Sequence, residues 1–139
     1  MKFKMRVLHF SPKGNAELIA NAIAREQKCN SDKIPPAYPC ENEKLLFIGV
    51  EAKGSAPDKS VDAFVKDLND SRTKNIAFYI VGGHDKYVNE LKDYATGRGI
   101  KVVGVHHVDV KGGLFSKPKV TDEQVKATVD WANKIVDSL

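Results

Sequence analysis

Long apolar runs are missing from this sequence of 139 residues. No segment approaches the about 20 consecutive apolar residues that a helix needs to span a bilayer. The amino-terminal MKFKMRV starts a strand-like segment and is not followed by the apolar region of a secretion signal. We therefore expect a cytoplasmic protein with no membrane partner.

Cysteine is scarce, with only Cys29 and Cys40, and these do not form a CxxC motif. Without a matching pair of histidines this spacing favours neither a zinc site nor a disulfide framework, so we expect free thiols. The neighbours His106 and His107 would point to opposite faces of a strand and could not readily share one metal ion. The sequence therefore predicts no metal site.

Two nucleotide-binding motifs are also missing. The sequence has neither GxxxxGK[ST] nor GxGxxG, which argues against nucleoside triphosphate hydrolysis and against a dinucleotide fingerprint. The excess of 22 Lys and Arg over 18 Asp and Glu gives a net charge of +4. The lysines are scattered and no aromatic residues alternate with them, so we expect no nucleic-acid partner.

The composition that remains is that of an ordinary globular domain. Hydrophobic residues make up 42% and charged residues 29% of the chain, and the length suits one domain over residues 1–139. Short apolar runs of the kind found in strands buried on both faces occur at Lys4–Phe10, Leu45–Val50, Ile76–Val81 and Lys101–His107, with a weaker candidate at Lys33–Ala37.

Apolar residues between these runs recur with helical spacing, around residues 18–23, 61–68, 87–95 and 125–136. Thr121 followed by Gln124 fits a capping box that opens the last helix, and Asp58 precedes an earlier one. Trp131 lies beside the apolar stripe of the last helix, where it would cover the edge or the surface of a sheet. The alternation of strand and helix predicts an α/β fold with a doubly wound parallel sheet.

Ligands of such sheets bind outside the carboxyl ends of the strands, where the strand order reverses. The loops at those ends are Ser11–Ala16, Glu51–Pro57 and Gly82–Tyr87. The first combines a hydroxyl, a lysine, a glycine and the plausible N-cap Asn15 at the start of a helix, which is the composition of an anion site. An ordinary capped turn has a similar composition, and composition alone does not choose between the two.

The segment SPKGNA resembles the phosphate loop of the flavodoxins, whose usual form is Ser/Thr-x-Thr-Gly-Asn-Thr followed by a helix. The resemblance extends to VLHFSPKGNAELIANAIA, to IVGGHDKYVNELKDYATGRGIKVVGV and to KGGLFSKPKVTDEQVKATVDWANKIV. These are similar to the first strand, loop and helix, to the fourth strand through the fifth, and to the closing loop and helix of that family. The resemblance implies a three-layer, doubly wound, five-stranded parallel sheet that binds FMN without a covalent link.

Carried over position by position, the resemblance implies three groups of cofactor contacts and no acid–base catalytic residue. The phosphate would be surrounded by Ser11, Lys13, Gly14, Asn15 and Ala16. The flavin ring would be flanked by the backbone of Glu51, Ala52, Lys53 and Gly54 and by that of Gly82, Gly83, His84 and Asp85. Tyr87 is the candidate for stacking on the ring.

The resemblance implies an FMN-dependent electron carrier that acts with redox partner proteins, as a monomer or a homodimer. Lys13 and Ala16 stand where the family usually has hydroxyl residues, and EAKGSAP lacks the aromatic residue that often covers the other face of the flavin. Two alternatives follow. One is a flavodoxin-fold protein without flavin that acts as a binding or regulatory module, and the other is a small FMN-dependent NAD(P)H reductase.

Overall fold

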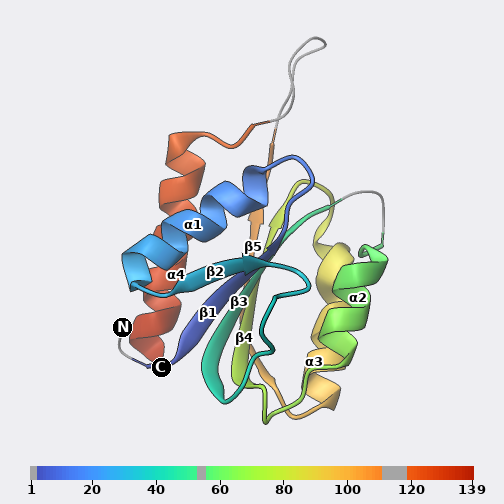
Figure 1. Cartoon of the computed structure of the whole chain (residues 1–139). Helices are drawn as coiled ribbons and strands as arrows, with labels where there is room; N and C mark the ends of the chain where they lie inside the picture. The colour runs from blue at the N-terminus through green and yellow to red at the C-terminus, as the bar shows by residue number, and fades with distance from the viewer. Residues whose placement is uncertain (1–2, 53–55, 111–118) are drawn as a thin grey trace.

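Five parallel strands form one sheet in the order β2-β1-β3-β4-β5 (Figure 1). The computed structural model describes residues 3–52, 56–110 and 119–139. The strands are β1 (Met5–Phe10), β2 (Asn30–Lys33), β3 (Glu43–Glu51), β4 (Thr73–Val81) and β5 (Lys101–Val108). The chain moves outward from β1 to β2 and then returns to pair β3 with the other side of β1. The strand order therefore reverses beside β1, and this is where an open α/β sheet places its ligand.

Helices cover both faces of the sheet, so the predicted three-layer fold is confirmed (Figure 1). The helices are α1 (Asn15–Gln27), α2 (Lys59–Lys66), α3 (Asn89–Gly97) and α4 (Asp122–Ser138), with a short 3-10 helix η1 (Asp85–Val88). Helices α1 and α4 pack on one face, whereas α2 and α3 pack on the other. The connections between successive parallel strands carry these helices across the sheet, as expected for a doubly wound fold.

The predicted position of the second strand is wrong. We expected a strand over Lys33–Ala37, but β2 covers Asn30–Lys33 and pairs with β1. Pro35 and Pro36 have no backbone N–H and cannot extend a ladder, so the strand ends before them. An edge strand that pairs through its backbone does not need an apolar run, and NSDK has none.

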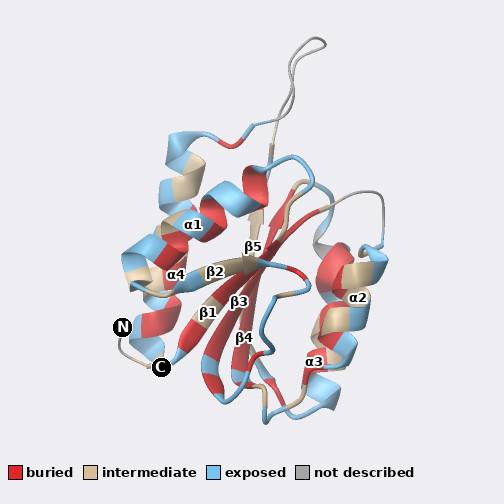
Figure 2. Ribbon diagram, viewed as in Figure 1, coloured by how far each residue is buried: buried red, intermediate tan, exposed pale blue. Residues whose placement is uncertain are grey.

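The interior strands β3 and β4 supply side chains to the core on both faces of the sheet (Figure 2). Alternate side chains of β3 and β4 enter different clusters, because successive strand residues point to opposite faces. Phe47 and Tyr79 belong to the cluster under α1 and α4. Ile48 and Phe78 belong to the cluster under α2 and α3. Burial on both faces explains why these strands are near-continuous apolar runs.

Two glycines leave room for aromatic side chains on the α1/α4 face of the sheet. A Cβ atom at Gly49 would lie 1.9 Å from Cζ of Tyr79, so the Tyr79 ring occupies the space above the β3 backbone. At the sheet edge, Trp131 stacks on His106 with ring centroids 5.2 Å apart and lies over Gly104 of β5. The predicted role of Trp131 as a cover of the sheet edge is confirmed.

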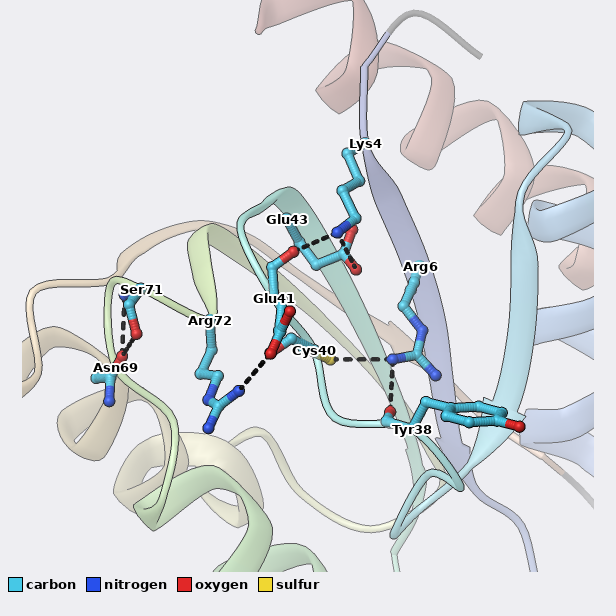
Figure 3. A network of polar contacts seen from close by, with 9 residues as sticks. All are labelled: Lys4, Arg6, Tyr38, Cys40, Glu41, Glu43, Asn69, Ser71 and Arg72. Carbon is cyan, nitrogen blue, oxygen red and sulfur yellow. Dashed lines mark hydrogen bonds and ion pairs between the residues drawn. The ribbon is translucent and has the colours of Figure 1, made fainter.

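Polar contacts at the amino ends of the strands hold the connection between β2 and β3 in place (Figure 3). The guanidinium of Arg6 donates to the carbonyl oxygen of Tyr38, at 2.8 Å, and lies 3.6 Å from Sγ of Cys40. The guanidinium of Arg72 donates to the carbonyl oxygen of Cys40, at 3.2 Å, and pairs with the Glu41 carboxylate. The free cysteine Cys40 is buried near the amino ends of the strands, at the opposite end of the sheet from the predicted ligand site.

Candidate functional site

A cavity of about 280 Å³ opens at the carboxyl ends of the strands beside the point of reversal. It is lined by Pro12, Lys13, Asn15, Glu51, Ala52, Val81, Gly82 and Val110. These residues come from the ends of β1, β3, β4 and β5 and from the start of α1. The loops predicted from the sequence to form a ligand site therefore do meet around one cavity.

Helix α1 begins without a side-chain cap of its own. Gly14 is the N-cap residue and has φ 87°, a left-handed conformation that glycine adopts without a steric penalty. The prediction that Asn15 is the N-cap is wrong, because Asn15 is the first helical residue. Its buried side chain instead accepts a hydrogen bond from the N–H of Val120, at 3.1 Å, before α4. The first N–H groups of α1 are consequently left for another partner.

One such partner is the side chain of Glu51, the last residue of β3. Oε1 of Glu51 accepts a hydrogen bond from the N–H of Lys13, at 2.7 Å. Oε2 accepts one from the N–H of Ala16, at 3.0 Å, and another from the Ser11 hydroxyl. Ser11 Oγ in turn accepts from the N–H of Glu17, at 2.8 Å. The loop therefore surrounds a carboxylate of its own chain at the positive end of α1.

The Glu51 carboxylate is buried, with only 4% of the residue exposed. It lies on the same face of the sheet as Tyr79, whose hydroxyl donates to the carbonyl oxygen of Ala16, at 2.7 Å. Burial, with a smaller contribution from the negative charge of Glu51, raises the pKa of Tyr79 well above its ordinary value. Tyr79 therefore remains a neutral donor that supports the first turn of α1 from below.

The second and third loops meet beside the cavity. The N–H of Ala52 donates to the carbonyl oxygen of Val81, at 3.0 Å, so β3 and β4 stay paired as they reach the site. A Cβ atom at Gly83 would lie 2.4 Å from the Cβ of Ala52, so only glycine fits against this loop. Gly82 lines the cavity, and its carbonyl oxygen lies 3.1 Å from Nε2 of His107.

The other residues predicted to contact the cofactor do not all lie at the cavity. Lys13 is exposed and lines the cavity, whereas the exposed His84 precedes η1. Asp85 begins η1. Lys53 and Gly54 lie outside the described residues.

Tyr87 is only 2% exposed and belongs to the hydrophobic cluster under α2 and α3. Its hydroxyl oxygen accepts from the N–H of Asp58, at 3.3 Å. In this position its ring has almost no accessible surface to stack on a flavin. Stacking by Tyr87 stays a prediction that would need the side chain to leave this packing.

The sequence prediction missed the role of the Glu51 side chain, because it assigned only the backbone of Glu51 to a flavin ring. A signal was available in the run LLFIGVE, where one acidic residue ends a buried strand. Its period-two position places it on the same face as Phe47 and Gly49, which is the face that α1 covers. A buried carboxylate requires hydrogen-bond donors, and the uncapped start of α1 supplies them.

The donors of this loop fit a phosphate group. A hydroxyl and two backbone N–H groups at a helix N-terminus are typical partners of a bound anion, and here they already hold a carboxylate. The same atoms cannot hold Glu51 and a phosphate together. An external phosphate therefore requires the Glu51 side chain to leave the loop.

Within the parts of the chain that the structure describes, no group of His, Cys, Asp and Glu side chains is arranged to hold a metal ion. None of the helices in those parts has both the length and the apolar character needed to cross a membrane.

Known proteins resemble this chain in their structures, whereas no similarity is found at the level of sequence. No family model matches the sequence, and the search of curated proteins finds no match to it either. Among solved structures, the flavodoxin of Streptococcus pneumoniae TIGR4 is similar with a TM-score of 0.67 and 15% identity, covering 97% of this chain and 99% of that one. Two-electron reduced flavodoxin from Megasphaera elsdenii is similar with a TM-score of 0.69 and 19% identity, covering 94% and 98%.

A flavoprotein from Lactobacillus acidophilus NCFM, solved in complex with FMN, gives a TM-score of 0.61 at 17% identity and covers 76% of this chain and 93% of its own. These likenesses extend over most of the chain, and they agree with the strand order β2-β1-β3-β4-β5. The resemblance to flavodoxins that the sequence suggested is thus confirmed in the architecture, and this chain has the flavodoxin-like fold.

Proposed function

We propose that this chain is an electron carrier that binds FMN at the carboxyl ends of β1, β3 and β4. The observation that carries the proposal is the convergence of the Ser11 hydroxyl and two backbone N–H groups on one anion at the start of α1. That anion is the Glu51 carboxylate, which stands in for the phosphate. The adjoining cavity lies where the strand order reverses, and the flavodoxin-like fold of the chain agrees with this assignment.

In this proposal the chain binds and positions the cofactor. Ser11 and the N–H groups of Lys13 and Ala16 would hold the phosphate, and the exposed Lys13 side chain would add a positive charge at the rim. The apolar wall formed by Ala52, Val81 and neighbouring residues would exclude water from the ring. FMN supplies the redox chemistry by accepting and donating electrons.

Redox partner proteins would dock at the carboxyl ends of the strands, beside the bound FMN. The chain would act as a monomer or a homodimer. A net charge of +4 favours partners with an acidic surface, because complementary charge accelerates encounter. Reduction of cytochrome c, a basic acceptor, would then be slow and would become faster with rising salt.

The direct test is a titration of the purified protein into FMN, followed by the quenching of flavin fluorescence. The proposal predicts saturable binding at one site per chain and, after chemical reduction, electron transfer from the bound flavin to a one-electron acceptor. A protein that ignores FMN at concentrations up to the millimolar range would contradict it.

A second candidate function has a specific observation in its favour. Because Glu51 satisfies the anion donors internally, the loop is complete without a cofactor. The chain would then be a flavodoxin-fold module that binds a protein partner and no flavin. Failure of FMN and riboflavin to bind, together with recovery of one defined partner in a direct binding assay, would favour this candidate.

A further inference from the structure

We propose that Glu51 determines whether the loop accepts phosphate, because its carboxylate competes with an external phosphate for the same donors. For FMN the inference rests on the function proposed above, whereas for inorganic phosphate it depends only on the loop. The inference predicts that the Glu51 side chain on β3 sets the affinity of the loop for the phosphate group of a ligand, although β3 is remote from the loop in sequence.

The competition follows from the hydrogen bonds. Both oxygens of Glu51 are in use, one by the N–H of Lys13 and the other by the N–H of Ala16 and the Ser11 hydroxyl. A phosphate bound at the start of α1 would need these donors. An occupant that is part of the chain is present at a high effective concentration, so an external anion must displace it at a cost in apparent affinity.

Charge adds to the competition. The carboxylate lies in a buried place, where its charge is held by a neutral hydroxyl and by backbone N–H groups. Like charges repel more strongly in such a place than in water, so a phosphate cannot bind beside Glu51 while the carboxylate remains. The carboxylate must turn away, and it gives up its charge-assisted hydrogen bonds when it does so.

The first turn of α1, which presents the donors, is held in place by Tyr79 and does not depend on Glu51 alone. Gly49 lets the Tyr79 ring lie under the first turn of α1, and the Tyr79 hydroxyl donates to the carbonyl oxygen of Ala16. The N–H of Ala16 donates to the Glu51 carboxylate, at 3.0 Å. The turn that presents the donors is therefore fixed from below, so removal of the carboxylate leaves donors that still point into the loop.

The consequence is a weak preference of the natural protein for FMN over riboflavin, which lacks the phosphate. In Glu51→Ala the donors are released and the repulsion is removed. The ratio of the riboflavin Kd to the FMN Kd should then rise by about tenfold, which is slightly less than one charge-assisted hydrogen bond contributes.

The experiment measures the Kd values of inorganic phosphate, FMN and riboflavin by calorimetry, for the natural protein and for Glu51→Ala and Glu51→Gln. The glutamine keeps the shape of the side chain and removes its charge, so it remains informative if the alanine variant folds poorly. The matched control is Glu43→Ala, which removes another buried glutamate from the opposite end of β3. Glu17→Ala removes an exposed negative charge from the first turn of α1.

We expect Glu51→Ala to gain affinity for inorganic phosphate and for FMN but not for riboflavin, with a smaller gain in Glu51→Gln and little change in the controls. If no variant binds either flavin while Glu51→Ala gains phosphate binding, the competition stands and the FMN proposal fails. If the natural protein already prefers FMN strongly and both Glu51 variants leave that ratio unchanged, the competition is refuted and the FMN proposal stands. An equal gain in Glu17→Ala would also refute it, because charge alone would then explain the effect.

Discussion

Helices α1, α2 and α4 satisfy their first N–H groups in two different ways. Helix α2 is capped by Asp58, whose carboxylate accepts from the N–H of Ser60, at 3.0 Å. Helix α4 opens with a complete capping box between Thr121 and Gln124. Helix α1 has Gly14 as its N-cap residue and no side-chain cap from it. Glu51 from β3 accepts from the N–H groups of Lys13 and Ala16, and Ser11 Oγ accepts from that of Glu17.

The difference distinguishes the start of α1 as the place where the proposed exchange between Glu51 and an anion would occur. A local cap is fixed by the few residues around it, so no ligand is needed and none can easily replace it. A cap that arrives from another strand is a tertiary contact, and it can be withdrawn without unwinding the helix. The start of α1 is therefore the place where a bound anion would exchange with a residue of the chain.

The largest effect on stability should come from breaking the support beneath α1. Gly49→Ala would place a Cβ atom 1.9 Å from Cζ of the buried Tyr79 ring. The ring must move, and its hydrogen bond to Ala16 moves with it, so we expect a loss of about 3 kcal/mol in the free energy of unfolding. Urea denaturation followed by circular dichroism measures it.

The control for that substitution is Gly97→Ala at the end of α3, where a new Cβ atom meets no atom within 4 Å. Alanine is the better helix former, so we expect a gain of about 0.5 kcal/mol or no change. Equal losses in the two variants would show that the Gly49 effect is not a clash with Tyr79.

Removal of the tertiary cap should cost less, and phosphate should restore part of the loss. Glu51→Ala leaves the N–H groups of Lys13 and Ala16 without their carboxylate, at a cost of about 2 kcal/mol. Because phosphate can then fill the place, we expect the melting temperature of this variant to rise with phosphate concentration. At matched ionic strength, the natural protein should show no such rise; the same rise in both proteins would contradict the prediction.

Removal of a local cap should cost about 1 kcal/mol and give no response to phosphate. Thr121→Ala destroys the capping box of α4, and Asp58→Ala removes the acceptor at α2. Chemical denaturation with and without phosphate, at matched ionic strength, measures both effects. A phosphate response in either variant would mean that anions bind to any exposed helix start, and that α1 is not distinct.

The smallest effect concerns acid, and it again involves a residue near the loop. Burial lowers the pKa of His9, although the negative charges of Glu17, Asp32 and Glu51 partly oppose the shift. Burial also lowers the pKa of His106. The unfolded chain therefore takes up protons first, and the free energy of unfolding should fall as the pH drops below about 6.5, until the folded histidines titrate at their lower pKa values.

His9→Phe removes one of these groups while it keeps a ring of similar size, so the acid-induced fall in stability should become smaller. The double variant with His106→Phe should flatten the profile further. Urea denaturation from pH 7.5 to 5 measures the three profiles. An unchanged slope in the double variant would show that other groups cause the acid sensitivity.

The fold was predictable from the sequence because its central strands are buried on both faces. Runs such as Leu45–Val50 show no alternation, and helical periodicity between the runs completes the α/β pattern. The polar edge strand β2 was placed wrongly, since its pairing through the backbone leaves no side-chain pattern to detect. The capping box of α4 and the side-chain cap of α2 were predictable because their partners are three and two residues apart.

The meeting of the candidate-site loops around one cavity was predictable, whereas the contacts within that cavity were not. The topology brings the predicted loops to one edge of the sheet, so the location follows from the strand order. The contact between Ser11 and Glu51 joins residues 40 positions apart in the sequence, and the lining of the cavity depends on such pairs. The burial of Tyr87 under α2 and α3 agrees with its place in the apolar stripe over residues 87–95, whereas its stacking role came from the resemblance alone.

The most direct test of the account is the amide proton chemical shifts of Lys13 and Ala16 in the natural protein and in Glu51→Ala, with the amides of Ser60 and Gln124 as references at the locally capped helices. An N–H that donates to a carboxylate resonates downfield, so we expect the amides of Lys13 and Ala16 to move upfield in Glu51→Ala. They should move back downfield when phosphate is added, while the amides of Ser60 and Gln124 keep their shifts. Amides at Lys13 and Ala16 that do not move on removal of Glu51 would show that its carboxylate does not occupy the loop.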